Sequence, residues 1–149
     1  MKLGINEGKT IQFYKTKMVF KASTEQTDGA YTTILMTHPA WVGPALHLHP
    51  DGAETFFILK GNYTFTLGDD IMEASVGDFI LIPKNQAHKY ISGAEGGQML
   101  VTTPSGVEQY FLHIAARLLE GEIPLAEEFE FAKRHGQIFL DSSGHWGHK

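Results

Sequence analysis

Two histidines separated by one residue are the first feature of this sequence that could do chemistry. His47 and His49 lie in the stretch GPALHLHPDGAETFFILKG (43–61). In an extended strand, side chains two residues apart point the same way, so both imidazoles share one face and Leu48 takes the other. A Pro-Asp-Gly turn follows and allows Glu54 to return beside them. The stretch therefore predicts three ligands close together.

A fourth candidate ligand lies in a second stretch, GDFILIPKNQAHKYIS (77–92). A strand over residues 78–82 should end at Pro83, and after a short turn His88 should open the next strand. Burying three imidazoles and a carboxylate on one face without an ion would be costly. We therefore expect one divalent transition metal, Fe, Mn, Ni, Cu, Co or Zn, since imidazole and carboxylate suit these ions. Its expected ligands are His47, His49, Glu54 and His88.

The spacing of these residues resembles the two motifs of the cupin superfamily. The first motif contains HxH, then a glutamate, then a glycine, and the second contains a glycine, a proline and a histidine. The matching residues are His47, His49, Glu54 and Gly61 for the first motif, and Gly77, Pro83 and His88 for the second. The resemblance implies a small single-domain protein, all-β with C-terminal helices, in which the strands form a double-stranded β-helix (cupin or jelly-roll) barrel.

The sequence departs from these motifs at turn positions only. The first glycine, Gly43, is two residues closer to His47 than in the motif, and Trp41 holds the expected place. Asn85 replaces a glycine, which is a mild change because Asn tolerates a positive φ better than most residues. Ser92 replaces a final asparagine. These changes affect loop geometry and leave the expected ligands intact.

Composition narrows the class of protein. The chain has 149 residues, a net charge of −5 and no cysteine. The charge argues against nucleic acid as a partner, and the missing cysteines exclude disulfides and thiolate metal sites. The sequence contains neither an apolar signal segment nor a run long enough for a membrane span, so we expect a soluble cytoplasmic protein with no membrane partner.

The order of apolar and polar segments suggests three parts within one domain: an N-terminal arm with edge strands (1–29), the barrel (30–104), and a C-terminal helical segment and tail packed on the barrel (105–149). Segments 30–38, 63–67 and 98–104 read as strands, the last of these being the final strand of the chain. Turns are expected at 61–62 and 92–97 because both are rich in glycine. His38, just before a proline, is expected in a loop or at the rim.

The C-terminal part has helical signals. Ser105 and Glu108 fit a capping box. Apolar side chains recur at helical spacing on one face, and a second helix should begin at Pro124. His113 falls on the opposite, wet face. The apolar positions are Val107, Phe111, Ile114 and Leu118. The residues after 141 are expected to form a loose tail, whose His145 and His148 could bind metal only adventitiously.

The strands also carry residues that could line an apolar pocket, although core packing explains each of them equally well. They are Met36, Trp41, Phe56, Phe65, Tyr90 and Met99. Within the cupins, the sequence is most similar to the bacterial quercetinase-like group, in which PxxHxHPxxxExFFxLxG is followed by a run that here is Pro104, Gly106, Glu108 and Phe111. This resemblance implies a metal-dependent dioxygenase for a small phenolic or enolic, flavonol-like substrate, with Glu54 also acting as the base.

Two alternatives stay open at this point. A metal-dependent isomerase or lyase would use the ion only as a Lewis acid, and a ligand-binding cupin would have no turnover.

The N-terminal strands and the amphipathic helices offer more apolar surface than a barrel of this size needs, so we expect a homodimer.

Overall fold

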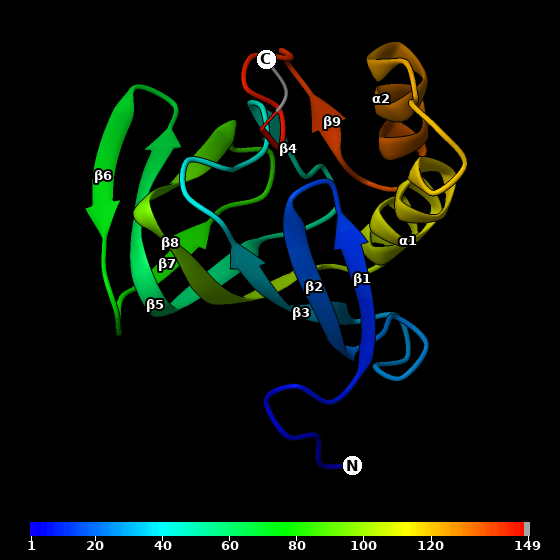
Figure 1. Cartoon of the computed structure of the whole chain (residues 1–149), viewed down its shortest axis with the longest axis horizontal. Helices are drawn as coiled ribbons and strands as arrows, with labels where there is room; N and C mark the ends of the chain where they lie inside the picture. Colours follow the sequence, from blue (N-terminus) through cyan, green and yellow to red (C-terminus); the bar gives the residue numbers. More distant parts are fainter. Residues whose placement is uncertain (148–149) are drawn as a thin grey trace.

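The computed structural model describes residues 1–147 and shows a curled β structure with two helices packed along one side (Figure 1). The strands are β1 (Lys9–Phe13), β2 (Thr16–Ala22), β3 (Tyr31–His38), β4 (His47–Leu48), β5 (Glu54–Leu67), β6 (Asp70–Ala74), β7 (Phe79–Ile82), β8 (His88–Pro104) and β9 (Ile138–Phe139). The helices are α1 (Val107–Leu118) and α2 (Leu125–Arg134). Fold class and C-terminal helices are as the sequence predicts.

All strand pairs are antiparallel, and the long strands β5 and β8 form the centre of the sheet. One path of neighbouring strands runs β1-β2-β3-β8-β4-β9, while β5 pairs with β8, β6 and β7. In Figure 1 the β1–β3 strands lie in front, β6 lies at the edge farthest from the helices, and β4 and β9 close the upper end. The expected metal ligands all lie on β4, on the loop after it, or at the starts of β5 and β8.

The turns expected at 61–62 and 92–97 are wrong, because both segments are inside the β5–β8 ladder. Gly61 pairs with Gly97, and the register shifts between Ile58 and Lys60 and again between Gly61 and Tyr63. The first shift places one extra residue, Leu59, in β5, and the second sets Asn62 of β5 opposite residues 93–96 of β8. Such irregularities bend a strand, which allows the sheet to curl. Glycine at these positions therefore marks a bend rather than a chain reversal.

The interior is filled by alternate residues of the strands and by one face of α1. Ile34 of β3, Phe56 of β5 and Val101 of β8 belong to one apolar cluster. Phe13 and Met18 of the β1–β2 hairpin belong to the same cluster and are fully buried. The N-terminal strands thus share the core of the barrel.

Helix α1 packs as its apolar spacing predicts, but its start differs from the expected capping box. Gly106, at a φ of 91°, is the N-cap and Ser105 makes no cap. The Glu108 carboxylate instead accepts hydrogen bonds from the backbone N–H (2.8 Å) and the hydroxyl of Thr24. The Thr24 hydroxyl also accepts from the Gly106 N–H at 2.8 Å. A residue 82 positions away therefore provides the cap, which no local pattern could reveal.

The segment after α2 packs on the barrel through β9 and through the buried His145 and Trp146, although residues 140–144 between them are exposed, so the expectation of a loose tail is wrong for residues up to 147. Strand β9 pairs with β4, and His145 forms a bridge with Gly43. Trp146 is 2% exposed and its ring lies 5.3 Å from that of Phe13. Its large apolar surface explains why the segment packs. His148 lies outside the described residues. No helix in the part of the chain described here has both the length and the hydropathy to span a membrane.

Candidate metal centre

The structure brings His47, His49, Glu54 and His88 into one buried cluster. One possible ligand atom from each residue lies within 4.8 Å of all the others. His47 pairs directly with His88 across β4 and β8, and Glu54 begins β5. Each of the four residues is at most 6% exposed. The geometry thus unites residues that are up to 41 positions apart in the sequence, from 47 to 88.

Each of the three imidazoles is oriented by a backbone carbonyl. The Nδ1 atoms of His47, His49 and His88 lie 2.8, 3.0 and 2.8 Å from the carbonyl oxygens of Ala45, Gly136 and Gln86. A carbonyl can only accept, so Nδ1 carries a hydrogen in each ring, which leaves Nε2 as the atom that can bind a metal ion once it holds no proton. Histidine ligands are commonly fixed by such a second hydrogen bond. The donor set therefore fits a divalent transition metal held by three Nε2 atoms and a carboxylate.

The electrostatic interactions within the cluster favour an ionised carboxylate at Glu54. Burial would raise the pKa of Glu54, but the charges and hydrogen bonds of His49 and His88 outweigh it, so its pKa is well below its usual range. Burial, together with His88 and His49, lowers the pKa of His47. Burial would also lower the pKa of His49, yet the nearby Glu54 carboxylate raises it overall. Glu54 Oε1 lies 3.0 Å from His88 Nε2 and 3.3 Å from His49 Nε2, so the carboxylate is ionised between the two rings.

A small cavity of about 10 Å³ adjoins the cluster. That volume holds about one water molecule. Its lining residues come from the strands, from the loop before β4, from α1 and from the C-terminal segment. The main lining residues are Met36, Phe56, Tyr90, Phe111, Gln137 and Trp146, beside His47 and Glu54.

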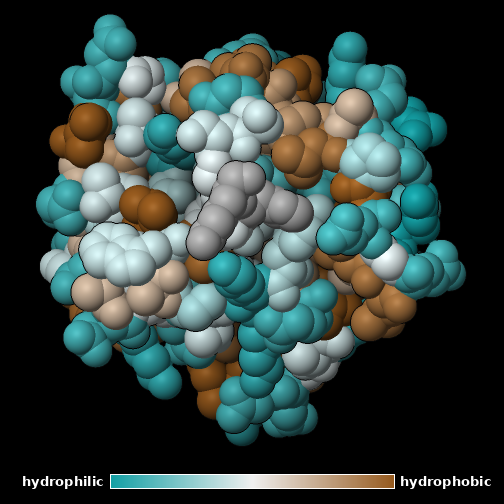
Figure 2. Space-filling model, turned by 45° about the horizontal axis from the view of Figure 1, so that its top comes forward, coloured by the Kyte–Doolittle hydropathy of each residue, from teal (hydrophilic) through white to brown (hydrophobic). Residues whose placement is uncertain are grey.

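Over the coloured part of the face in Figure 2, hydrophobic residues form separate small patches among hydrophilic ones.

The expected pocket residues divide into three groups. Met36, Phe56 and Tyr90 line the cavity. Phe65 and Met99 are fully buried in the core but are not among the lining residues. Trp41 is 62% exposed, so its assignment to the pocket is wrong. It takes a φ of 60° in the loop before β4, where the motif has glycine, and its ring stays at the surface. Trp146, an aromatic residue from the tail, lies at the cavity instead.

Two other motif departures have clear structural roles. Asn85 takes a φ of 66°, as its replacement of a glycine predicts. The Ser92 hydroxyl donates to the Pro39 carbonyl at 2.6 Å and accepts from the Val42 N–H at 3.0 Å, which fixes the loop leading to the histidine strand. A Cβ on Gly43 would lie 1.9 Å from the Tyr90 carbonyl oxygen, so this loop approaches β8 too closely for any side chain there.

His38 is buried rather than at the rim, which corrects the expectation for this residue. It is 3% exposed, and its Nδ1 and Nε2 lie 2.8 and 3.0 Å from the hydroxyls of Tyr63 and Tyr90. Burial lowers the pKa of His38 to about 3, so the ring is neutral. The strand pattern places His38 on the inner face with Met36, and this alternation was the available signal.

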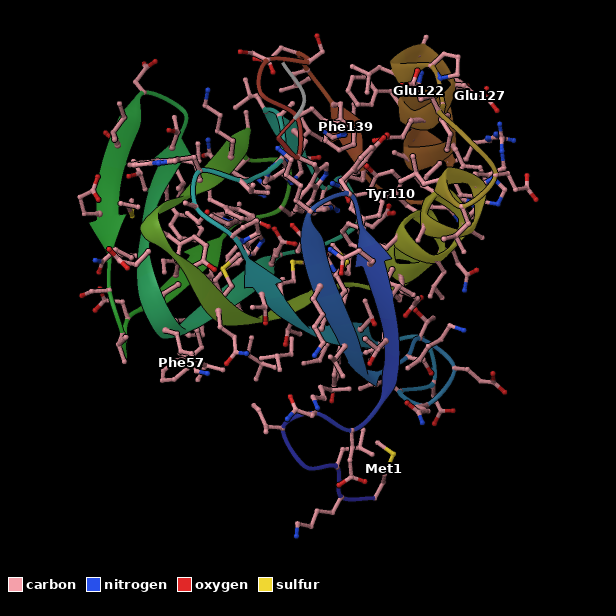
Figure 3. The ribbon with its side chains drawn as sticks, viewed as in Figure 1. Met1, Phe57, Tyr110, Glu122, Glu127 and Phe139 are labelled. Atoms are coloured by element: carbon pink, nitrogen blue, oxygen red, sulfur yellow. The ribbon has the colours of Figure 1, made fainter. Side chains whose placement is uncertain are left out.

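A second buried polar cluster lies behind the metal centre and was missed in the sequence. The Glu128 carboxylate of α2 accepts hydrogen bonds from Tyr14, from Tyr110 (2.6 Å) and from His145 Nε2 (2.6 Å). Figure 3 shows Tyr110 near Phe139, between α1 and β9. Burial would raise the pKa of Glu128, but these hydrogen bonds lower it overall. The partners are 17 to 114 residues apart, so no local motif announces them.

This second cluster is joined to the metal centre through the backbone of one residue, Ala45. The Ala45 N–H donates to His145 Nδ1 at 3.2 Å, and the Ala45 carbonyl accepts from His47. Because His145 Nδ1 accepts, its hydrogen is on Nε2 and is donated to Glu128. The C-terminal segment thus orients His47 through His145, and it orients His49 through the Gly136 carbonyl.

Comparison with known proteins identifies the class of protein that this fold and site define. The model of the cupin domain matches residues 34–109, half of the chain, and the protein therefore belongs to the cupin family. The match spans β3 to α1 and includes all four residues of the cluster.

Among individual proteins, the chain is similar to a quercetin 2,3-dioxygenase of Bacillus subtilis (strain 168), with 26% identity over 102 residues. This alignment covers 68% of the chain but only 30% of the relative. The polyketide cyclase RemF of Streptomyces resistomycificus shares the fold at a TM-score of 0.61 and 17% identity, over 70% of this chain and 78% of RemF. KdgF of Halomonas sp. also shares the fold, at a TM-score of 0.56 and 12% identity, over 64% of this chain and 84% of KdgF. These two structures support the fold alone.

Proposed function

We propose that this cupin is a metal-dependent dioxygenase that acts on a small phenolic or enolic, flavonol-like substrate. The observation that carries the proposal is the buried set of three Nε2 atoms and one carboxylate, each ring fixed by a carbonyl, beside a cavity with an apolar wall. The similarity to a quercetin 2,3-dioxygenase supports this choice among the reactions that cupins perform.

The residues of the cluster have separate roles in metal binding and proton transfer. The three histidines and one oxygen of Glu54 would hold the ion, which when bound supplies Lewis-acid polarisation and a path for electrons to dioxygen. Glu54 is ionised and has a second oxygen available, so it can hold the proton of a substrate hydroxyl. The apolar wall, which includes Met36 and Phe56, excludes water and favours a flat aromatic ligand.

The size of the cavity adds a requirement. A volume of about 10 Å³ cannot hold a flavonol, and Gln137 and Trp146 of the C-terminal segment are among the residues that line it. A substrate larger than a few atoms must therefore displace part of the lining, and we propose that this segment is the part that moves. The same segment fixes His49 and His47, so opening and metal geometry are coupled in the proposed mechanism.

The first experiment is elemental analysis of protein purified without a chelating column, beside the His88→Ala variant. About one equivalent of a transition metal is expected in the wild type and much less in the variant, because one of four ligands is lost. Absence of metal from both, even after reloading, would remove the basis of the proposal.

The second experiment is oxygen uptake by the metal-loaded protein with a panel of flavonols and enols. One dioxygen should be consumed for each substrate molecule, because a dioxygenase transfers both oxygen atoms to its product. Failure across the panel would contradict oxygenation. The Glu54→Gln variant then separates the remaining functions: conversion of substrate that depends on Glu54 indicates an isomerase or lyase, and ligand binding without conversion indicates a binding protein.

A further inference from the structure

One hydroxyl group at the cavity has no strong acceptor among the described residues. Tyr90 lines the cavity beside His47 and Glu54 and is 4% exposed. Its hydroxyl lies 3.0 Å from His38 Nε2 and 3.6 Å from the Met36 sulfur. Tyr63, on the other side of the same imidazole, is not among the residues that line the cavity.

The direction of these hydrogen bonds follows from counting hydrogens. His38 is neutral, so one ring nitrogen donates and the other accepts. If Tyr63 donates to Nδ1, then Nε2–H donates to the Tyr90 oxygen, and the Tyr90 hydrogen is directed to Met36. The opposite arrangement would direct the Tyr63 hydrogen to no acceptor in the described structure. The first arrangement satisfies all three groups.

In that arrangement the Tyr90 hydrogen is donated to a thioether, which is a weak acceptor. A ligand oxygen in the cavity would be a much better acceptor, and the exchange would cost little. A tyrosine hydroxyl has a pKa of about 10, so the Tyr90 hydroxyl carries its hydrogen at neutral pH. The lining has a second polar group as well, since the buried Gln137 Oε1 lacks a partner among the residues described.

We propose that Tyr90, positioned by His38, donates a hydrogen bond to the enol or enolate oxygen of the substrate. The class of substrate rests on the proposed function, and the inference names the residue that recognises its reactive oxygen. His38 acts only through Tyr90 and is a positioning residue.

The test is ligand binding without oxygen, using 3-hydroxyflavone and flavone as probes on the metal-loaded protein. The two probes differ only in the 3-hydroxyl group. Fluorescence and absorbance titrations give the preference of each variant for the hydroxylated probe. Tyr90→Phe should reduce this preference about tenfold or more, since a hydrogen bond to an ionised oxygen is lost, while flavone binding changes little.

Tyr63→Phe is the matched control. It removes a hydroxyl group from the other nitrogen of His38 and leaves the Tyr90 hydroxyl at the cavity. His38 Nε2 can then accept from Tyr90 and compete with the ligand, so the preference should fall, but by much less than in Tyr90→Phe. Metal content and thermal unfolding are measured for both variants. The inference is overturned if Tyr90→Phe keeps the wild-type preference, if Tyr63→Phe loses it equally, or if the wild type shows no preference.

These outcomes are independent of turnover. A protein that consumes no oxygen but shows the expected loss in Tyr90→Phe contradicts the proposed dioxygenase and supports the role of Tyr90. A protein that consumes oxygen, but whose Tyr90→Phe variant keeps the preference for the hydroxylated probe, supports the proposed dioxygenase and contradicts the role of Tyr90.

Discussion

His38 shows how a single buried imidazole makes the stability of the fold depend on pH. Its pKa is about 3 in the folded protein because of burial, against about 6.5 in an unfolded chain. Below about pH 6.5 the unfolded chain therefore binds a proton that the folded protein does not. The stabilising contribution is complete above that pH and is lost as the pH falls toward the folded pKa.

We expect His38→Gln to reduce the acid sensitivity of the protein. Within the window between the two pKa values, His38 should add up to about 1.4 kcal/mol per pH unit to the fall in the free energy of unfolding. Urea unfolding at a series of pH values measures this slope. His113→Gln is the control, because His113 is exposed and stacked on Phe131. Equal slopes for His38→Gln and the wild type would contradict the prediction.

At the residue scale, the ligands of the metal centre were predictable because short local patterns in the sequence identify each of them. HxH on a strand, a glutamate after a turn and a histidine opening another strand each follow from local geometry. Trp41 and His38 show the limit. The strand period places His38 inside, but the following proline suggested a loop. Trp41 lies in a loop whose left-handed φ has no sequence signal when the residue is not glycine.

At the scale of elements, helices and most strands were predictable from their periods, whereas their connections were not. Gly61 and Gly97 read as turns because glycine favours them, yet the opposing strands continue through both residues as bulges. The docking of β9 on β4 depends on contacts more than 90 residues apart, such as Leu46 with Asp141. Such contacts depend on the complete core rather than on any segment of the sequence.

The C-terminal segment is fixed to α2 by the buried Glu128 cluster. Glu128→Ala would leave His145, Tyr110 and Tyr14 without the carboxylate that they share. We expect a loss of about 3–5 kcal/mol in the free energy of unfolding, because three buried donors would each lose a hydrogen bond to a charged acceptor. His145→Ala should act on the same cluster, so the double variant should lose much less than the sum of the two. Chemical denaturation of the four proteins measures both effects.

The exposed pair of Arg117 and Glu127 is a control for this experiment. Its N–O distance, 2.6 Å, equals that of His145 and Glu128, but its side chains are 38% and 50% exposed. Glu127 lies at the outer edge of the helices in Figure 3. Glu127→Ala should cost less than about 1 kcal/mol, because solvent screens such a pair. Equal losses for Glu127→Ala and Glu128→Ala, or additive losses for Glu128→Ala and His145→Ala, would contradict the structural role of the buried cluster.

At the scale of the whole molecule, the outer face of the sheet has an apolar row that the interior does not use. Phe57 of β5 pairs with Phe79 of β7 and with Leu100 of β8, and Leu81 is two residues from Phe79 on the same face. Phe57, Phe79 and Leu81 are 41%, 61% and 52% exposed. In Figure 3 Phe57 points away from the barrel. Neighbouring exposed apolar side chains of this size favour an interface.

We expect this row to be the contact face of a homodimer. A twofold axis through the row would pair it with its own copy, so each copy would bury the same apolar side chains. Light scattering should then give about twice the subunit mass of 16.5 kDa. Replacing both Phe79 and Leu81 by lysine should shift the protein to the monomer, because two charges would be buried at each side of the interface.

Ile71→Lys provides the comparison, since Ile71 is 72% exposed but lies on β6, away from the β5–β7 pairing that forms the row. This variant should keep the dimer, because a charge at an exposed position outside the interface meets no partner surface. A wild-type protein with the mass of one subunit at all concentrations would contradict the dimer. A dimer that survives the double substitution would instead place the contact elsewhere, with the unpaired edge of β1 as the next surface to test.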